Sequence, residues 1–550
     1  MSGTLASNSY GQPTMVTPKI KDLLFNRGFW VSNQRNQTDQ TNKMNHKNLF
    51  RSHHSHCLFL VATLILSTLS ACMVGPNFQR PGPDVPAGWV GPSPAAEAIS
   101  PEFVDLSSWW TSFEDPALTA LIKRAVETNL DLRLARARIR QARAARGIAA
   151  SGFGPTVDVP ASYRRSRSPG SETGRTTGLS DADTPTKGPI TNSYQIGFDA
   201  AWELDIFGGI RREVEAAEAD IEFAIEGHRS VLVSLLAEVA RNYVDLRSFQ
   251  QRIILAGRNL QAQKHTAKLT RERFEGGFVS GLDVANAEAQ VATTASQIPL
   301  LESSLQQTMY RISVLLGLEP AALMKELTPA LEIPTSSPAV PLGVPSDLLR
   351  RRPDIRQAEA DIHGATARIG VATSDLFPRF NILGAAGYQT AQFGSWFDTI
   401  SRFWSIGPSV SWRIFDTGRI RSNIEQQKAL EEQALISYRQ TVLVALEEVE
   451  NTLIASAKED ERRNALVQAV TANRKAVTLA TRIYTEGQTD FLNVLQAQRA
   501  LYDTEDALAQ STRTVSVNLI SLYKALGGGW EPVSDATYPA GSGIISSSTR

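Results

Sequence analysis

The two halves of the 550-residue chain repeat one another, and this repeat limits the folds that the chain can adopt. At an offset of 210 residues Trp202 matches Trp412, and further upstream, at an offset of 223, Pro155 matches Pro378. Other pairs at the offset of 210 are Glu238 and Glu448, Gly277 and Gly487, Leu282 and Leu492, and Gly317 and Gly527. The offsets differ because residues 163–191, rich in Ser, Gly, Arg and Thr, form an enlarged loop. Each half therefore predicts the order helix, strand, loop, strand, long helix, tight turn and helix.

Residues 194–206 carry the pattern of a strand with two different faces. Apolar side chains occupy every even position, whereas the odd positions include Gln195, Asp199, Glu203 and Asp205. Strict alternation over this length is typical of a barrel strand that faces lipid on one side and water on the other. We expect Asp199, Glu203 and Asp205 to line the barrel lumen, together with Arg413 of the matching stretch. A soluble sandwich with one buried face is the alternative.

The sequence predicts four strands, at residues 156–163, 193–206, 379–389 and 403–415. Four strands cannot close a membrane barrel, and an open sheet edge is not tolerated in lipid. The chain must therefore oligomerise to complete a barrel, although this argument does not give the number of copies. Aromatic side chains suited to the two membrane interfaces are Tyr194, Trp202, Tyr388, Trp404 and Trp412.

Two proline-free stretches, residues 209–275 and 418–484, predict unusually long helices. Each would be roughly 100 Å long at a rise of about 1.5 Å per residue. A turn containing glycine and a shorter returning helix follow each of them, at residues 282–316 and 491–526, with an interruption expected near Pro299. Apolar residues recur at spacings of three and four, which indicates coiled-coil packing. A filamentous rod would share this pattern but would not explain the alternating strands.

The segment before Cys72 has the features of a lipoprotein signal peptide. The apolar stretch 58–71 follows Lys47 and Arg51 and is too short to span a bilayer. Residues 69–72, Leu-Ser-Ala-Cys, resemble a lipobox and predict a diacylglycerol and an N-acyl chain (palmitate or a similar acyl group) on Cys72. An ordinary signal peptide is the alternative. Residues 44–71 form the predicted signal peptide, and residues 1–43 are expected to be an upstream mis-start or a discarded leader.

Several function classes are disfavoured by composition. Lys+Arg and Asp+Glu number 56 each, which argues against a nucleic-acid-binding protein. The chain has two cysteines, and Cys57 leaves with the predicted leader, so no cysteine-based metal site is expected. No phosphate-binding Gly-rich loop and no metal-ligand cluster is present in the sequence. We therefore expect no enzyme activity and no cofactor apart from the lipid on Cys72.

The remaining segments are assigned by composition and by the repeat. Residues 72–114 predict an extended N-terminal wrap, and the Pro-rich residues 319–345 predict a link in a belt around the helices. The two repeats occupy residues 115–318 and 346–527. Residues 528–550 form a Ser- and Gly-rich tail.

With these residues in view, the chain resembles the TolC-like outer-membrane factor family, and within it the NodT-like lipoprotein subgroup. The resemblance covers residues 72–529 and rests on several short segments in a fixed order. These are Cys72-Met73-Val74-Gly75-Pro76-Asn77-Phe78, Trp109-Trp110, Phe113-Glu114-Asp115-Pro116, Arg351-Arg352-Pro353-Asp354-Ile355, Ser374-Asp375-Leu376-Phe377-Pro378, Ile406-Gly407-Pro408 and Phe415-Asp416.

The resemblance implies an α+β membrane protein. It would be a homotrimer in the outer membrane, with four strands per copy in one shared β-barrel and a long periplasmic α-barrel of coiled-coil helices. It also implies a passive exit duct for drugs or other small molecules in a tripartite efflux pump. Its partners would be a periplasmic membrane-fusion adaptor and an inner-membrane transporter of the RND type. A type I protein-secretion duct and a non-conducting structural coiled-coil lipoprotein are the alternatives.

The two turns between long and returning helices are the candidate functional site that the resemblance implies. Adaptor docking is expected there, and the residues assigned to it are Gly277, Ser280, Leu282, Tyr484, Gly487 and Gln488. Ser280 or Asp490 is expected to cap a returning helix. A plain helical hairpin with capping residues is the alternative.

The second turn and the start of its returning helix are expected to form the periplasmic gate. The residues assigned to the gate are Asp490, Leu492, Asn493 and Gln496, with Asp283 as a further nearby acid. Relatives often carry carboxylates where this chain has Asn493 and Gln496. Because a ring of carboxylates concentrates cations, we expect weaker cation selectivity here than in an acid-ringed relative.

Overall fold

The computed structural model describes residues 73–82, 85–90, 106–169, 189–336 and 344–530. The chain divides into the units Met1–Ala71 and Cys72–Arg550, and all described residues belong to the second. The predicted leader and signal peptide, the lipidation site Cys72 and the tail beyond Trp530 lie outside the described residues.

Each half opens with two helical segments where the sequence predicted one. In the first half these are α2 (Pro116–Thr128), preceded by the short helix η1 (Trp109–Phe113), and α3 (Leu130–Ser151). The break falls at Asn129, whose side chain accepts from the Leu132 amide and donates to the Leu315 carbonyl at 2.8 Å. In the second half the break between α7 (Pro345–Arg351) and α8 (Pro353–Ser374) falls at Arg352, which donates to the Ala525 carbonyl at 2.9 Å.

Long helical hairpins follow in both halves. The helices α4 (Gly209–Glu275) and α9 (Arg419–Thr485) have 67 residues each, and the returning helices α5 (Gly281–Leu315) and α10 (Phe491–Ala525) have 35 each. Their bounds follow the offset of 210 residues. The expected interruption near Pro299 is wrong, because α5 runs unbroken through it. Packing along α4 holds α5 together despite the backbone hydrogen bond that a proline cannot make.

The first hairpin is followed by the Pro-rich link, and α7, α8 and two strands then precede the second hairpin. The one-turn helix α6 (Met324–Leu327) lies in the Pro-rich link. None of the helices in the described ranges is long and apolar enough to cross a membrane.

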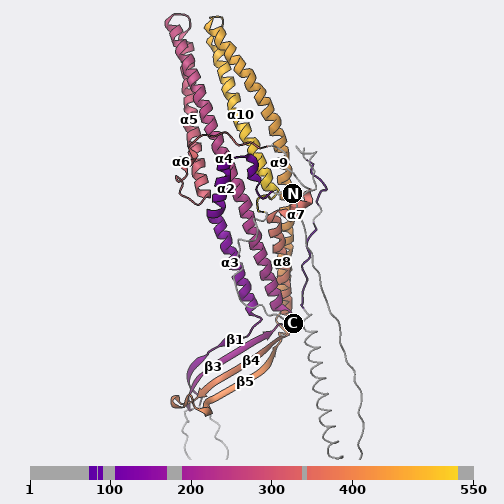
Figure 1. Cartoon of the computed structure of the whole chain (residues 1–550). Coiled ribbons are helices and arrows are strands. Elements are labelled where there is room, and N and C mark those ends of the chain that lie inside the picture. The colour runs from indigo at the N-terminus through magenta and orange to yellow at the C-terminus, as the bar shows by residue number, and fades with distance from the viewer. Residues whose placement is uncertain (1–72, 83–84, 91–105, 170–188, 337–343, 531–550) are drawn as a thin grey trace, which may run out of the picture. The chain divides into compact units, whose positions relative to one another are not determined.

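One antiparallel sheet lies at the end of α3, α4, α8 and α9 that is remote from the helix turns (Figure 1). Its strands are β1 (Thr156–Asp158), β2 (Ala161–Arg167), β3 (Ile190–Leu204), β4 (Arg379–Thr390) and β5 (Arg402–Ser411). The short helices η2 (Phe393–Ser395) and η3 (Thr399–Ser401) lie between β4 and β5. The predicted strand 156–163 is thus two strands, separated at Pro160, that reach Arg167. The predicted strand 403–415 ends at Ser411, because its partner β4 begins opposite that residue.

The sheet has two open edges within the described residues. β3 pairs with β4 and β4 with β5, whereas β1 and β2 both pair with the other side of β3. Pro408 is tolerated in β5 because this strand lies at an edge. Large apolar side chains of β5 are exposed, including Trp404 at 78% and Ile406 at 73%. Since no second layer covers this face in the described structure, the soluble-sandwich alternative is not supported.

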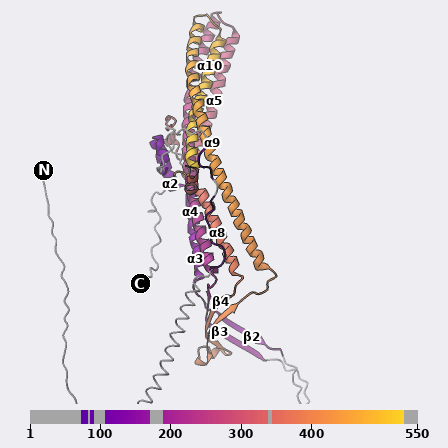
Figure 2. The same ribbon diagram turned by 90° about the vertical axis from the view of Figure 1, so that its right-hand side faces the viewer.

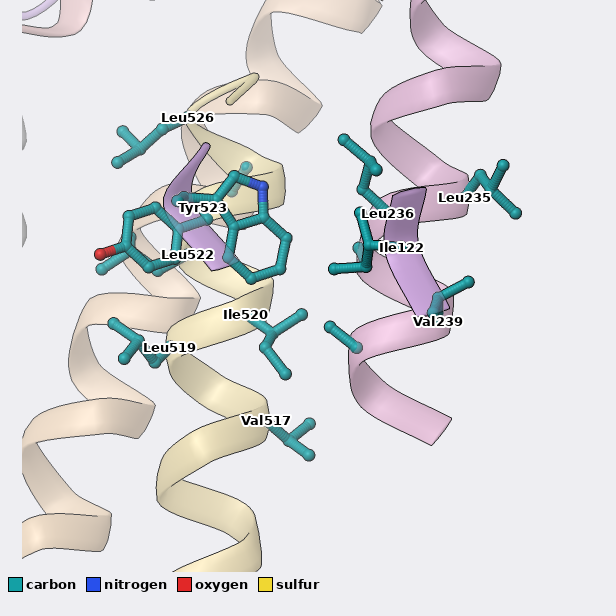
Figure 3. Packing of buried hydrophobic residues seen from close by; sticks show 14 of the residues in the cluster. Ile122, Leu235, Leu236, Val239, Val517, Leu519, Ile520, Leu522, Tyr523 and Leu526 are labelled. Carbon is teal, nitrogen blue, oxygen red and sulfur yellow. The ribbon is translucent and has the colours of Figure 1, made fainter. Parts of the chain in front are cut away.

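The largest hydrophobic core lies midway along the helices, where the ends of the returning helices meet the chain segments around them. Figure 3 shows Ile122 of α2 beside Leu236 and Val239 of α4, facing Ile520 and Tyr523 of α10. Trp109 stacks on Tyr523 with ring centroids 5.1 Å apart. This core therefore fixes the first hairpin against the second.

Candidate functional site at the helix turns

The first turn, between α4 and α5, is closed by one glycine and one capping box. Gly277 has φ +77°, a conformation that glycine adopts at little cost, and the Phe278 amide donates back to the Arg273 carbonyl at 2.9 Å. Ser280 caps α5, as expected, and the Asp283 carboxylate accepts from the Ser280 amide at 3.0 Å. The Asp283 carboxylate is therefore engaged in the cap of the first hairpin.

The second turn, between α9 and α10, repeats this backbone without the same cap. Gly487 also has φ +77°, and the Gln488 amide donates to the Ile483 carbonyl at 2.9 Å. Asp490 stands at the N-cap position, but its side chain makes no capping hydrogen bond. Instead, Asn493 donates to the Thr489 hydroxyl at 2.7 Å. The exposed Asp490 carboxylate is thus left outside the cap.

The first turn of α10 presents a neutral surface. Leu492 is 52% exposed, and Asn493 and Gln496 are exposed beside it, whereas Phe491 and Val494 are buried. The helical spacing of Leu492, Asn493 and Gln496 places the three on one side of the helix. The structure therefore brings these expected gate residues together, and Asp283 lies on the other hairpin.

Five of the six residues assigned to docking are exposed at the turns, but Tyr484 is not. The exposed ones are Gly277, Ser280, Leu282, Gly487 and Gln488. Tyr484 is 1% exposed and belongs to a small core with Phe491 and Val494, so its expected place on the docking surface is wrong. Phe278 was not among the residues predicted for docking, although it is 78% exposed at the first turn. An aromatic residue within a Gly-rich turn is the sequence feature that could have identified it.

Arg273 connects the two hairpins at the turns. Its guanidinium donates to the Tyr484 carbonyl and lies 4.6 Å from the centre of the Tyr484 ring. The Tyr484 hydroxyl donates to the Thr270 hydroxyl at 3.2 Å. Side chains of α4 therefore hold the end of α9. Sequence reasoning missed Arg273, because nothing in the sequence shows that residues about 210 apart meet there.

Of the four residues expected to line a barrel lumen, two lie outside the strands of the sheet. Asp199 and Glu203 lie in β3, and Glu203 is 3.9 Å from Arg379 of β4. Asp205 instead caps α4, since its carboxylate accepts from the amides of Ile210 and Arg211 at 3.0 Å each. Arg413 lies beyond the end of β5. The alternating pattern of the sequence does not show where a strand ends and where the residues that cap the next helix begin.

Aromatic side chains gather at both ends of the sheet. At the end next to the helices, Trp202 donates to the Phe153 carbonyl at 2.9 Å and Trp412 to the Leu376 carbonyl at 3.0 Å. At the far end Tyr194 stacks on a neighbouring ring. The rings next to Tyr194 are those of Tyr163, Phe393 and Trp396. The ring next to Tyr388 is that of Phe397. Amphipathic rings at two levels are typical of the two interfaces of a membrane.

The segment that follows the predicted lipidation site is fixed beside the sheet. Arg212 of α4 is fully buried, and it donates to the Val74 carbonyl at 3.1 Å and to the Asn77 side chain at 2.7 Å. A Cβ on Gly75 would come within 2.5 Å of the Gly370 backbone. The chain next to Cys72 is therefore tied to the junction of sheet and helices. Among the described residues, no group of His, Cys, Asp and Glu could hold a metal ion.

Comparisons with known proteins agree with this architecture. The family model described as outer membrane efflux protein matches residues 121–318 and 344–528. Nodulation protein T of Rhizobium leguminosarum bv. trifolii is 31% identical over 473 residues, which cover 85% of this chain and 97% of that protein. The toluene efflux pump outer membrane protein TtgF of Pseudomonas putida is 30% identical over 477 residues, covering 85% and 96%.

A solved structure agrees as well. The outer-membrane channel OprN has a TM-score of 0.76 to this chain at 38% identity, and the match covers 84% of this chain and 100% of that one. The family model alone covers more than half of the chain. The chain therefore belongs to the outer membrane efflux protein family.

Proposed function

We propose that this outer-membrane protein is the exit channel of a tripartite efflux pump, a passive duct for small molecules. Its family consists of outer-membrane efflux channels and not of enzymes. A relative at 30% identity is described as the outer membrane protein of a toluene efflux pump, which supports small, apolar cargo. The partners in this proposal are a periplasmic adaptor at the helix turns and an inner-membrane transporter of the RND type.

The observation that carries the proposal is the pair of open sheet edges, on β1 and β2 and on β5. Backbone groups at such edges have no hydrogen-bond partners in hydrocarbon, so the edges must pair with other strands. Edge-to-edge pairing of copies closes one shared barrel. The symmetry that relates the copies in this barrel also places their helices side by side, as an α-barrel in the periplasm. A homotrimer with two structural repeats in each copy follows from the family resemblance.

A lipid anchor on Cys72 completes the proposal. Residues 73–77 are tied by Arg212 to the junction of sheet and helices, where aromatic rings mark one membrane interface. A multiply acylated cysteine next to this segment is thus held close to the lipid that it enters. Such an anchor binds stably, because each buried methylene contributes about 0.8 kcal/mol.

The test attaches a thiol-directed photocrosslinker to Gln488→Cys in the native host. Gln488 is exposed in the second turn, and the cysteines of the sequence are Cys57, in the predicted leader, and Cys72. Gln426→Cys is the matched control, since Gln426 is an exposed glutamine near the sheet end of α9. Trapped partners are identified by mass spectrometry.

Each outcome decides between the alternatives. Capture of an adaptor that pairs with a proton-driven transporter, from Gln488→Cys and not from Gln426→Cys, supports the efflux channel. An adaptor that pairs with an ATP-driven exporter supports a type I secretion duct. If no adaptor is captured and the purified protein forms no pores in planar bilayers, the chain is a structural lipoprotein.

A further inference from the structure

The chain has two junctions at which a strand leads into a long helix, and their charges differ. The first junction (residues 202–212) leads from β3 into α4, and the second (residues 412–422) leads from β5 into α9. Three positions differ most, and the pairs at the offset of 210 residues are Glu203 and Arg413, Asp205 and Phe415, and Gly209 and Arg419. The second junction therefore has two arginines and an aromatic ring where the first has two acids and a glycine.

The N-terminal segment covers the first junction. The Val74 amide donates to the Phe207 carbonyl at 3.1 Å, and Arg212 donates to the Val74 carbonyl. A Cβ on Gly208 would lie 2.8 Å from the Met73 side chain. This junction is thus closed by the residues that directly follow the predicted lipidation site.

The second junction has no such cover among the described residues. Gly418 has φ +89°, close to the φ +78° of Gly208, but a Cβ on Gly418 would meet no described atom within 4 Å apart from those of its chain neighbours. Thr417 and Ser422 take the positions of the ring and the guanidinium that act at the first junction. In Figure 2 the sheet end of α9 stands apart from α3 and α4. The repeat has therefore kept the glycine turn of the junction and left it open.

A cavity of about 830 Å³ lies at the second junction, and part of its wall is apolar. In this wall Trp412 is 56%, Ile414 82% and Phe415 86% exposed. The cause is the early end of β5 at Ser411, since β3 continues to Leu204, which matches Ile414. The residues beyond Ser411 therefore leave the sheet and form an apolar surface that stays exposed in the described structure.

Arginines form another part of the wall. Arg379 pairs with Asp375 at 2.6 Å, whereas Arg413 and Arg419 are exposed and form no ion pair with another described residue. Asp416 lies near both, but its carboxylate accepts from two backbone amides at the start of α9. A guanidinium presents several N–H donors in one plane and binds phosphate well. The cavity therefore combines two guanidinium groups that can bind an anion with an apolar wall.

The cavity lies at the level of a membrane interface. Trp412 of its wall donates to the Leu376 carbonyl, and Trp202 makes the matching hydrogen bond at the first junction. Such amphipathic rings are typical of the level of the lipid headgroups. A lipid with a phosphate in its headgroup is the ligand that fits two guanidinium groups beside an apolar wall at this level.

We propose that the cavity at the second junction binds one anionic glycerophospholipid of the surrounding membrane. Arg413 and Arg419 hold its phosphate, and one acyl chain lies along Ile414 and Phe415. The proposal uses the outer-membrane location of the chain and goes beyond the exit-channel function. Each junction is then held by a partner that carries acyl chains, because the N-terminal segment brings the proposed lipid of Cys72 close to the first. The phospholipid fixes the start of α9 as that segment fixes the start of α4.

Native mass spectrometry of the detergent-solubilised oligomer measures this binding. Phosphatidylglycerol is the probe, and phosphatidylcholine, whose headgroup has no net charge, is the reference. We expect the wild-type protein to bind phosphatidylglycerol more tightly than phosphatidylcholine. Arg413→Gln combined with Arg419→Gln should lower the affinity for phosphatidylglycerol roughly tenfold. The matched control, Arg138→Gln with Arg143→Gln, removes the same charge from exposed positions of α3 and should bind as the wild-type protein does.

Inorganic phosphate separates a lipid site from a simple anion site. At a concentration equal to that of the lipid, phosphate should leave phosphatidylglycerol bound, because only the lipid also contacts Ile414 and Phe415. Displacement of the lipid by phosphate would assign an anion site and overturn the lipid proposal. The same spectra give the mass of the oligomer, and where the double variant does not assemble, Arg419→Gln alone is compared in the same way.

The outcomes also separate this site from the exit channel. If the arginine variant binds phosphatidylglycerol as tightly as the wild-type protein, or if the α3 control loses as much affinity, the lipid site is refuted, while pores in planar bilayers keep the channel. Binding that depends on Arg413 and Arg419 in a protein that forms no pores supports the lipid site and refutes the channel.

Discussion

Arg273 acts between two elements and not within one. It stacks on Tyr484 and donates to its backbone carbonyl, and these contacts join the hairpin α4–α5 to the hairpin α9–α10. Charge-assisted hydrogen bonds are stronger than neutral ones. The half-buried Arg273 side chain is therefore expected to restrain movement of one hairpin past the other.

Loss of this contact should make the turns easier to separate. We predict that Arg273→Ala raises the mean single-channel conductance in planar bilayers and increases hydrogen exchange at the end of α9. Arg271→Ala is the control, because Arg271 pairs with Glu288 inside the first hairpin. Equal conductance changes in the two variants would show that Arg273 does not restrain the gate.

Prediction from sequence succeeded where spacing along one element decides the outcome. Leu492, Asn493 and Gln496 share an exposed side of α10 because their helical spacing requires it. It failed for Tyr484 and Asp205, because burial of the first and the capping role of the second depend on neighbours in the folded chain. Arg273 was missed for the same reason.

At the scale of elements, the lengths of the helices were predicted better than their breaks. The hairpin helices end within a few residues of the predicted bounds, because glycine turns and long apolar periodicity mark them clearly. The breaks at Asn129 and Arg352 were not expected, since both residues form them through carbonyls of distant helices. The opposite error occurred at Pro299, where packing along α4 keeps a helix that proline alone would interrupt.

The proline in α5 should still weaken that helix. We predict that Pro299→Ala stabilises α5 locally by up to about 3 kcal/mol, since it removes the ring clash and restores one backbone hydrogen bond. Slower hydrogen exchange around residue 299 would check this. The matching position in α10 is Ala509, so Ala509→Pro should accelerate exchange there. Unchanged exchange in both variants would contradict the expected cost of proline in these helices.

The start of α9 should depend on pH through Asp416. The amides of Ile420 and Gly418 donate to its carboxylate at 2.9 and 3.0 Å, and the Ile420 bond chiefly holds the pKa of Asp416 below its ordinary value of 3.8. A carboxyl with a lowered pKa stabilises the folded state above its unfolded pKa, and this contribution is lost as pH falls through the folded pKa. We predict that exchange protection of the Ile420 amide, corrected for intrinsic rates, falls below pH ~4.

The control for this prediction is Asp416→Asn. The amide side chain still accepts a hydrogen bond but does not titrate, so protection at Ile420 should be weaker at pH 6 and flat between pH 6 and pH 3. A wild-type protein whose protection is equally flat would show that the carboxylate does not hold the first turn of α9.

At the scale of the whole molecule, the sheet and the helix turns lie at opposite ends of the long helices, so their functions can be separated (Figure 1). The strands were predicted within a few residues, because alternation of apolar and polar residues is a property of the sequence alone. In the proposed channel, another copy of the chain closes the sheet and the row of helices. The sequence predicts that further copies are needed, because four strands cannot close a membrane barrel, but it does not give their number.

A channel built in this way should have a narrow end with little charge selectivity. In a symmetric assembly each exposed residue of the turns becomes a ring, and the rings of Leu492, Asn493 and Gln496 are neutral. Asp490 is exposed beside them, but Asp283 is held in the cap of α5. A channel lining with few fixed negative charges concentrates few cations. We predict a reversal potential close to zero in a salt gradient across a planar bilayer.

Adding charge to these rings should raise the cation selectivity above that of the wild-type protein. Asn493→Asp combined with Gln496→Glu should move the reversal potential toward that of a cation channel and make the conductance sensitive to divalent cations. Asp199→Asn with Glu203→Gln serves as the control for the barrel end, where acids in β3 also face the permeating ions in the proposed channel. Strong cation preference in the wild-type protein that this control pair abolishes would place selectivity at the barrel. If instead wild-type preference is strong and survives the control, the turns are selective despite their neutral rings and the prediction is wrong.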